Sequence, residues 1–307
     1  MHTFPRGCTP DAARAARLAY ATWAQAQAYL PVYWQPGWLD AVAPGQWWAT
    51  SAGEAWEVGE WAWPLVLRRT LGGRVAGPPE ASAYGGPWFP PGATAAVGLP
   101  AGCDYARLTC HQASAAWQFG RRCRALATQV VSLPELRPWT KPIRRLLRRG
   151  AETSVTEQVA FATVTQTVKA VLRTRPHLGR SAVWAAFERA AEVGYADCVV
   201  VREAATGHLQ GVAVCVYDER RAYTPMVLRL GGAPAPTSTL LQVRMIELAR
   251  GRGLLAVDLL SGYLPGVRKF LRQFGAVPEW YAQVRLTRGP LWALAEEVRA
   301  RTNHARL

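Results

Sequence analysis

The sequence predicts an α/β protein in which helices and strands alternate along most of the chain. The clearest observation lies between residues 240 and 286, where a helix, a short apolar run, a second helix and an aromatic strand follow one another. A second observation is that three strand-like segments and, before them, two helical segments precede this stretch. A third is that the first half of the chain shows a shorter version of the same order. The pattern therefore predicts two α/β units.

The first half begins with a predicted helix. Thr9 is suited to the N-cap and Pro10 to the first helical position, and the Ala/Arg-rich segment extends to about Tyr29. A short helical turn is expected near residues 38–42, and Gly and Pro predict loops at 77–79 and 84–91. Strands are expected at Trp47 to Ser51, Ala55 to Trp63 and Leu65 to Thr70.

The second half begins after Leu133 to Pro138, a Pro-containing segment suited to a connection. The predicted domains are therefore residues 1–132 and 133–307. A short basic helix follows from Lys141 to Gly150. Beyond it we expect helices at Ala160 to Arg173 and Ser181 to Glu192, and strands at Ala196 to Glu203, Leu209 to Tyr217 and Ala222 to Leu230.

The stretch from residue 240 onward has the most regular spacing. Its first helix has Ser238 as the candidate N-cap and ends at Gly251 or Gly253. The apolar run 254–259 is too short for a helix and predicts a buried strand, with Asp258 near its end. Residues 261–266 are expected to form a turn, and a second helix is expected to end at Gly275. In residues 279–286, aromatic and polar residues alternate, which predicts a strand.

Composition sets the class of protein. The chain has 307 residues, half of them hydrophobic, which is enough for one or two domains. Neither an 18-residue apolar run nor a secretory h-region is present, so we expect a cytoplasmic protein. The six cysteines form no C-x-x-C pair, which argues against a zinc site or a disulfide scaffold. The net charge of +15 predicts attraction to polyanions, although a compositional bias toward Arg is an alternative explanation.

Several motifs resemble one family. The strand ending in D-x-x-S-G, the helix V-R-K-F-L-R-Q-F-G-A and the strand with W-Y are similar to the C-terminal half of proteins built from tandem GNAT-like (N-acetyltransferase-like) units. These include the FemAB-like, tRNA-dependent aminoacyl transferases and their GNAT acetyltransferase relatives. The segments L-P-V-Y-W-Q-P-G-W-L-D-A-V and Y-G-G-P-W resemble the first half of the same family, so the resemblance covers roughly residues 29 to 287.

The resemblance implies two GNAT-like units in tandem with a cleft between them. The N-terminal unit would provide the acceptor side, and the C-terminal unit the acyl-donor side. The loop before the central helix departs from the acetyl-CoA-dependent pattern, Q/R-x-x-G-x-G/A, because it reads G-G-A-P-A-P-T-S. Pro234 and Pro236 remove two amides that a pyrophosphate cradle would use, which favours an aminoacyl-tRNA donor over acyl-CoA.

Three residues are candidates for acyl transfer to an amine. Lys269, one of three lysines in the chain, matches a lysine of the resembled family and would steady the ester carbonyl or a terminal phosphate; the alternative is a surface lysine. Asp258 would orient the attacking amine, or would cap the next turn. Tyr223 corresponds to a family tyrosine near the substrate, with core packing as the alternative.

Further residues are candidates for binding. Arg268 and Arg272 would contact phosphates. The acceptor and substrate contacts implied by the resemblance are Gln35, Tyr84, Trp88, Ser261 and Tyr263. The basic helix would contact a tRNA backbone or a diphosphate, or would simply be a solvated face; its four arginines are Arg144, Arg145, Arg148 and Arg149.

The sequence thus favours an N-acyltransferase that uses aminoacyl-tRNA, with no bound cofactor and no metal. One alternative is an acyl-CoA-dependent N-acetyltransferase. Another is a non-catalytic nucleic-acid or nucleotide-binding protein on a degenerate GNAT scaffold. The absence of a nucleophile triad does not separate them, because this chemistry can proceed by direct transfer.

Overall fold

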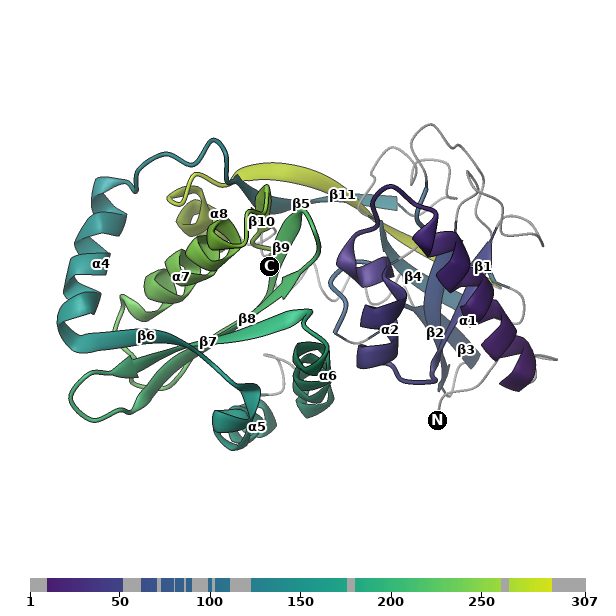
Figure 1. Cartoon of the computed structure of the whole chain (residues 1–307), viewed down its shortest axis with the longest axis horizontal. Helices are drawn as coiled ribbons and strands as arrows, with labels where there is room; N and C mark the ends of the chain where they lie inside the picture. The colour runs from purple at the N-terminus through teal and green to yellow at the C-terminus, as the bar shows by residue number, and fades with distance from the viewer. Residues whose placement is uncertain are drawn as a thin grey trace. The chain divides into compact units, whose positions relative to one another are not determined.

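The fold is mixed α/β, as predicted (Figure 1). The structure, a computed structural model, describes residues 10–51, 62–70, 73–79, 81–85, 87–89, 99–100, 103–110, 123–175, 180–260 and 265–288. Their contacts divide the chain into two compact units. Unit 1 comprises the described residues of Met1–Leu126 and Trp280–Leu307, and unit 2 comprises those of Ala127–Glu279.

Unit 1 combines helices with five neighbouring strands of the β-sheet. Its helices are α1 (Pro10–Gln25), the 3₁₀ turn η1 (Val32–Trp34) and α2 (Pro36–Val42). Its strands follow the order β1-β2-β3-β4-β11 and are antiparallel except for the parallel pair β3–β4. They are β1 (Trp47–Ser51), β2 (Ala62–Thr70), β3 (Gly73–Gly77), β4 (Tyr105–Cys110) and β11 (Val277–Thr287).

Unit 2 has strands in the order β5-β10-β9-β8-β7-β6, antiparallel except for the parallel pair β9–β10. The strands are β5 (Cys123–Ser132), β6 (Ser154–Val159), β7 (Ala196–Glu203), β8 (Leu209–Tyr217), β9 (Arg221–Arg229) and β10 (Ala256–Asp258). The helices are α4 (Lys141–Thr153), η2 (Phe161–Thr163), α5 (Thr165–Thr174), α6 (Ser181–Glu192), α7 (Thr237–Gly251) and α8 (Pro265–Arg272).

The two units repeat one strand pattern. In each, three antiparallel strands lead to a parallel pair, and an antiparallel strand completes the series: β1-β2-β3-β4-β11 in unit 1 and β7-β8-β9-β10-β5 in unit 2. The completing strands are exchanged, because β5 follows β4 in the chain and β11 follows β10. Strands β1–β2 of unit 1 therefore match β7–β8 of unit 2, and β3 matches β9.

Most predicted elements of the second half are confirmed, including α6, β7 and β8 at their predicted bounds. Strands β3 to β6 were missed because their apolar residues do not alternate cleanly. The predicted N-cap Ser238 is wrong, since α7 already begins at Thr237 with Pro236 as its N-cap. Helix α8 ends at Arg272 rather than at the predicted Gly275. Residues 55–61 and Thr9 lie outside the described residues.

Helix α7 packs on β7, β8 and β9, and every residue of β8 is buried, as expected for a strand covered on both faces. Two glycines permit close approach to α7. A Cβ on Gly211 of β8 would lie 2.7 Å from Thr237 Cγ2 and 3.1 Å from the carbonyl oxygen of Leu228. A Cβ on Gly150 of α4 would lie 2.8 Å from Leu240 Cδ1.

Gly211→Ala should therefore lower the free energy of unfolding by about 1 to 3 kcal/mol, because overpacking must shift α7 or a backbone carbonyl. Gly251→Ala, at the exposed end of the same helix, is the matched control, because a Cβ there meets nothing within 4 Å. Urea denaturation of both variants measures the difference. Equal stabilities would show that α7 does not depend on this contact.

Candidate active site

The parallel pairing of β9 with β10 ends in the middle of β9. The paired residues are Arg221 with Ala256, Ala222 with Val257 and Tyr223 with Asp258. Beyond them β10 stops, whereas β9 continues to Arg229. The two predicted catalytic residues of the strands, Tyr223 and Asp258, are thus the last residues paired. From Thr224 onward, β9 has no partner on this side among the described residues.

A β-bulge lies at the same point of β9. Tyr223 pairs with Val216 of β8 and Met226 pairs with Val214, so Thr224 and Pro225 lie opposite one residue. Proline has no N–H to donate to a ladder and is found in sheets at bulges and edges. Bulges redirect side chains and are frequent beside active sites. The sequence thus interrupts both neighbouring ladders of β9 within three residues.

Asp258 is fully buried, and the protein itself engages both carboxylate oxygens. Oδ1 accepts hydrogen bonds from the hydroxyl of Thr128 on β5 and from the backbone N–H of Leu260, the latter at 2.9 Å. Oδ2 lies 4.0 Å from a guanidinium nitrogen of Arg221. Leu260 has φ +56°, a left-handed conformation that is strained for a non-glycine residue. The carboxylate therefore fixes the backbone at Leu260, directly after β10.

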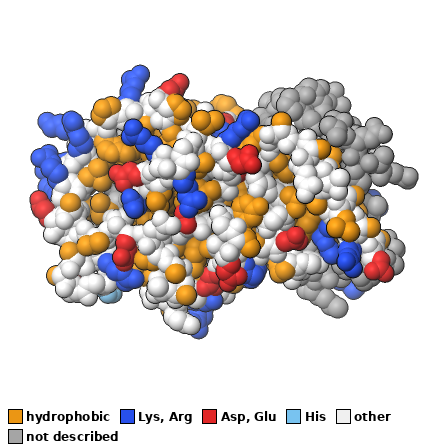
Figure 2. All heavy atoms as spheres, viewed as in Figure 1, with side chains coloured by type: hydrophobic (Ala, Val, Ile, Leu, Met, Phe, Trp, Pro, Cys, Tyr) orange, Lys and Arg blue, Asp and Glu red, His pale blue; other side chains and the backbone are white. Residues whose placement is uncertain are grey.

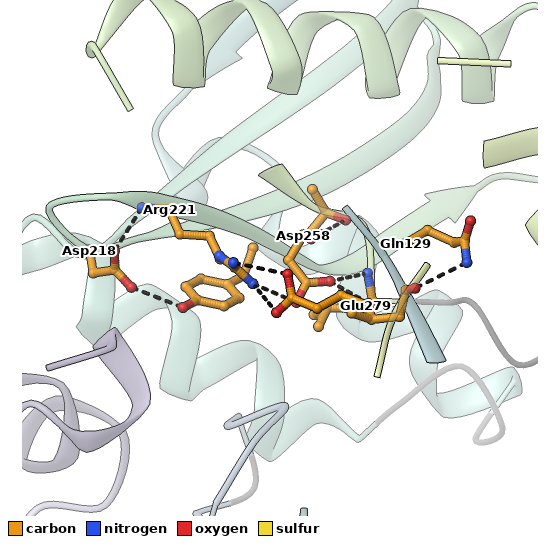
Figure 3. Close-up of polar contacts among 9 residues, drawn as sticks. Gln129, Asp218, Arg221, Asp258 and Glu279 are labelled. Atoms are coloured by element: carbon orange, nitrogen blue, oxygen red, sulfur yellow. Dashed lines mark hydrogen bonds and ion pairs between the residues drawn. The ribbon is translucent and has the colours of Figure 1, made fainter. Parts of the chain in front are cut away.

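Arg221 forms a bidentate ion pair with Glu279 at the start of β11. Its two terminal nitrogens donate to Glu279 Oε1 at 2.9 Å and Oε2 at 3.1 Å (Figure 3). Burial alone would lower the pKa of Arg221, but the hydrogen bonds and charge of Glu279, with the charges of Tyr223 and Asp258, raise it above the ordinary value. The guanidinium is therefore permanently charged. Its side chain is 18% exposed and that of Glu279 is 35% exposed, so solvent reaches this pair but not Asp258.

Asp218 orders the beginning of β9. Its Oδ1 accepts the backbone N–H groups of Arg220 and Arg221 at 2.9 and 2.7 Å, and its Oδ2 accepts the hydroxyl of Tyr223 at 3.0 Å. Figure 3 shows Arg221 between Asp218 on one side and Glu279 with Asp258 on the other. The Tyr223 ring is buried, and its hydroxyl is held by this aspartate.

Sequence reasoning missed five residues of this network: Thr128, Gln129, Asp218, Arg221 and Glu279. Arg221 lies just before the predicted strand Ala222 to Leu230, and Glu279 is the first residue of the predicted strand 279–286. Gln129, beside Thr128 on β5, is fully buried; its amide nitrogen donates to the Thr128 carbonyl at 3.0 Å, and its Oε1 has no hydrogen-bond partner among the described residues. A polar Thr-Gln pair inside the apolar segment L-A-T-Q-V-V was the available signal.

The three predicted cations of α8 do not join the network. Lys269, Arg268 and Arg272 are exposed, while Leu271 on the opposite face of the short helix is buried. None of the three cations forms an ion pair with a described residue. Ser261 and Tyr263, predicted to contact the substrate, lie outside the described residues.

Helix α4 presents its arginines to solvent. Arg144, Arg145, Arg148 and Arg149 are exposed, and none forms an ion pair with a carboxylate of the described residues. The opposite face packs through Ile143 and Gly150, which are buried. Figure 2 shows basic side chains gathered over the region of α4. The helix is therefore a separate cationic surface of unit 2.

The predicted acceptor-side residues lie in unit 1. Gln35 is the N-cap residue of α2, and its side-chain amide donates to the Leu30 carbonyl at 2.9 Å. Tyr84 and Trp88 are buried. Tyr84 packs edge-on against Tyr281, with ring centroids 5.5 Å apart, and Trp88 packs against Trp34 at 5.6 Å. Both side chains therefore pack within the aromatic core of unit 1.

The loop before α7 lacks two backbone donors, because Pro234 and Pro236 have no N–H. The Thr237 N–H bonds to the Pro234 carbonyl and the Leu240 N–H to the Pro236 carbonyl. The guanidinium of Arg229 donates twice to the Ala233 carbonyl, at 3.1 and 2.7 Å. Within the first helical turn, Ser238 and Thr239 keep N–H groups without an acceptor among the described residues.

The described cysteines are poorly suited to nucleophilic chemistry. Burial raises the pKa of Cys110, Cys198 and Cys215 to about 12, and that of Cys103 to about 11, so these thiols stay protonated at neutral pH. Among the described residues, no group of His, Cys, Asp and Glu could hold a metal. No helix in the described part of the chain is long and apolar enough to cross a membrane.

Comparisons with known proteins identify the fold. No family model matches the sequence, and no curated protein matches it. Among solved structures, the C-terminal domain of a putative lysylphosphatidylglycerol synthetase from Agrobacterium fabrum has a TM-score of 0.57 at 16% identity, covering 92% of this chain and 95% of that one. FemX has a TM-score of 0.56 at 9% identity, covering 87% and 95%.

A third solved structure is a tandem GNAT protein from the clavulanic acid biosynthesis pathway. It has a TM-score of 0.50 at 12% identity and covers 91% of this chain and 96% of that one. At these identities the likeness establishes the fold. The chain has the GNAT-like, FemAB-like acyltransferase fold, with two such units in tandem.

Proposed function

We propose that the protein is an N-acyltransferase that moves an aminoacyl group from tRNA to an amine. The observation that supports this proposal best is the polar network at the end of the β9–β10 pairing. It combines an interrupted strand, a bulge and a permanently charged guanidinium that solvent can reach. An acyl donor can approach backbone groups of β9 there without displacing another strand.

Direct transfer needs no enzyme nucleophile. The amine nitrogen attacks the ester carbonyl carbon, the carbonyl oxygen gains negative charge, and the bond from carbon to the ribose oxygen then breaks. The amine loses a proton, and the ribose oxygen gains one. A cation near the carbonyl stabilises the developing oxyanion, and Arg221 is suited to this because Glu279 fixes its orientation.

Asp258 and Tyr223 act as positioning residues in this proposal. Asp258 has no solvent-exposed surface and holds the backbone N–H of Leu260, while Tyr223 is fixed by Asp218. Lys269 is exposed on α8, so it would reach the ester carbonyl or a terminal phosphate from the solvent side. Arg268 and Arg272 would add phosphate contacts from the same helix.

Two features favour tRNA over acyl-CoA as donor. The loop before α7 contains two prolines, which have no N–H, and the N–H groups of Ala233 and Thr237 bond to carbonyl oxygens of the protein, so four of its backbone positions are closed to a pyrophosphate. The exposed arginines of α4 supply the cations that a polynucleotide backbone requires. The names of two structural neighbours, a lysylphosphatidylglycerol synthetase and FemX, are consistent with aminoacyl transfer. A tRNA donor would require a cytoplasmic location.

An acyl-CoA-dependent N-acetyltransferase is the second candidate. The free N–H groups of Ser238 and Thr239 at the start of α7 favour it, because they can bind phosphate oxygens. The tandem GNAT neighbour, whose structure was solved without AcCoA, is the comparison that supports it.

The first functional prediction separates the two donors. Deacylated tRNA should bind appreciably at moderate salt, whereas acetyl-CoA should bind weakly, because Pro234 and Pro236 lack the N–H groups that a pyrophosphate cradle would use. Isothermal titration with each donor measures this. Tight, stoichiometric acetyl-CoA binding without tRNA affinity would reverse the donor assignment and leave the acyl-transfer proposal in place.

The second functional prediction concerns α4. Converting Arg144 and Arg148 to Gln should weaken tRNA binding and reduce the slope of log affinity against log salt by up to about 2, roughly 0.7–0.9 per lost phosphate contact. The matched control converts the exposed Arg14 and Arg69 of unit 1 to Gln, which removes the same charge elsewhere. If both double variants change the slope equally, α4 is only a solvated face.

The third functional prediction concerns Lys269. Lys269→Ala should reduce transfer from the true donor by at least about 100-fold, while the urea midpoint stays unchanged because an exposed lysine contributes little to the core. Lys269→Arg is the matched variant, since it keeps the charge and should retain part of the activity. Full activity of Lys269→Ala would remove this lysine from the mechanism.

A further inference from the structure

Unit 2 contains a pocket that lies outside the polar network around Arg221 and Asp258. Its volume is about 640 Å³, within the range of small-molecule sites. Its walls are the connection from β5 to α4 and the turn between α8 and β11, two segments far apart in the sequence. Figure 1 shows this connection passing beside α8.

One wall of the pocket is aromatic and firmly packed. Trp139 meets Phe274 edge-on, with ring centroids 6.2 Å apart, and Phe270 meets Phe274 at 5.1 Å. Phe274 is buried in the unit 2 core, and Leu136 and Trp139 pack against that core. The indole is half-buried, and its N–H has no partner among the described residues. The wall therefore offers a fixed ring surface and one unused donor.

The rim of the pocket is cationic. Arg137 and Arg272 both line it, both are exposed, and neither forms an ion pair with a described carboxylate. Arg202, Arg221 and Arg252 of the same unit, by contrast, each have a carboxylate partner. Glu135 is the one acidic residue among the lining side chains. The pocket thus combines an aromatic wall with two available guanidinium groups.

The pocket is distinct from the network. Its β5 lining residues are Val131 and Ser132, which pair with Val257 and Ala256, whereas Asp258 pairs with Val130. The network residues Arg221, Tyr223, Asp258 and Glu279 do not line it. Occupation of the pocket would therefore leave Arg221, Tyr223, Asp258 and Glu279 unobstructed, and it would engage Arg272, to which the proposed function gives a phosphate contact.

We propose that this pocket binds a small ligand made of a planar ring and an anionic group, either a carboxylate or a phosphate. The ring packs against Trp139 and Phe274, and the anion accepts hydrogen bonds from Arg137 and Arg272. Guanidinium groups form bidentate pairs with both anions, so charge complementarity defines the shared chemistry.

Three probes test the proposal by calorimetric titration of the full chain: adenosine monophosphate, indole-3-acetate and uncharged adenosine. At least one of the two anions should bind with a Kd below 1 mM, on the order of ligand affinities for such pockets, and adenosine should bind at least about tenfold more weakly. The anion that binds more tightly shows whether the natural ligand is a phosphate or a carboxylate.

The double variant Arg137→Gln/Arg272→Gln should weaken binding of the more tightly bound anion at least about tenfold, because it removes two exposed cations and leaves the core intact. Arg268→Gln, on the same helix but outside the pocket lining, is the matched control and should leave the affinity unchanged. Trp139→Leu should weaken binding of the same anion as well. No binding of either anion, or equal losses in the control and in the double variant, would overturn the proposal. Neither outcome depends on whether the chain transfers acyl groups.

Discussion

The buried carboxylate of Asp258 joins three segments that are distant in the sequence. It accepts the Thr128 hydroxyl from β5, holds the Leu260 N–H of the turn that follows β10, and faces Arg221 of β9. A carboxylate without solvent is stable only if its oxygens are paired and hydrogen-bonded. The identity and position of its partners are therefore constrained, and with them the place where β9 and β10 separate.

The need to pair a buried carboxylate also determines which charges surround Arg221. One guanidinium faces Glu279 closely and Asp258 at a longer distance, so two carboxylates share one cation. Because Glu279 is partly exposed and Asp258 is not, the two carboxylates are not equivalent. The buried one holds the backbone at Leu260, whereas the partly exposed one orients a cation that solvent reaches. In the proposed function, stability and chemistry therefore divide between two acids on a single arginine.

The sequence was most informative where periodicity and apolar runs were regular. Strands β7 and β8 and helix α6 lie at their predicted bounds, and the two predicted strand residues Tyr223 and Asp258 pair with each other. Lys269, the third predicted residue, lies on an exposed face of α8. The partners of Asp258 could not be predicted, because Thr128 and Arg221 approach it through pairing of β5 and β9 with β10, and such non-local register has no signature in any one segment.

Because β5 and β11 are exchanged between the units, cutting the chain after residue 132 would remove part of the network. Unit 2 extends from Ala127 to Glu279, so Thr128 and Glu279 of the network lie at its two ends. The predicted boundary after residue 132 lies inside this unit. A fragment beginning at residue 133 would lack Thr128 and Gln129, and it would leave β10 with an unpaired edge where β5 now binds. It would also bury the Asp258 carboxylate without its hydroxyl donor. The reaction centre proposed for unit 2 therefore requires the strand that leads into it and the first residues of the strand that leaves it.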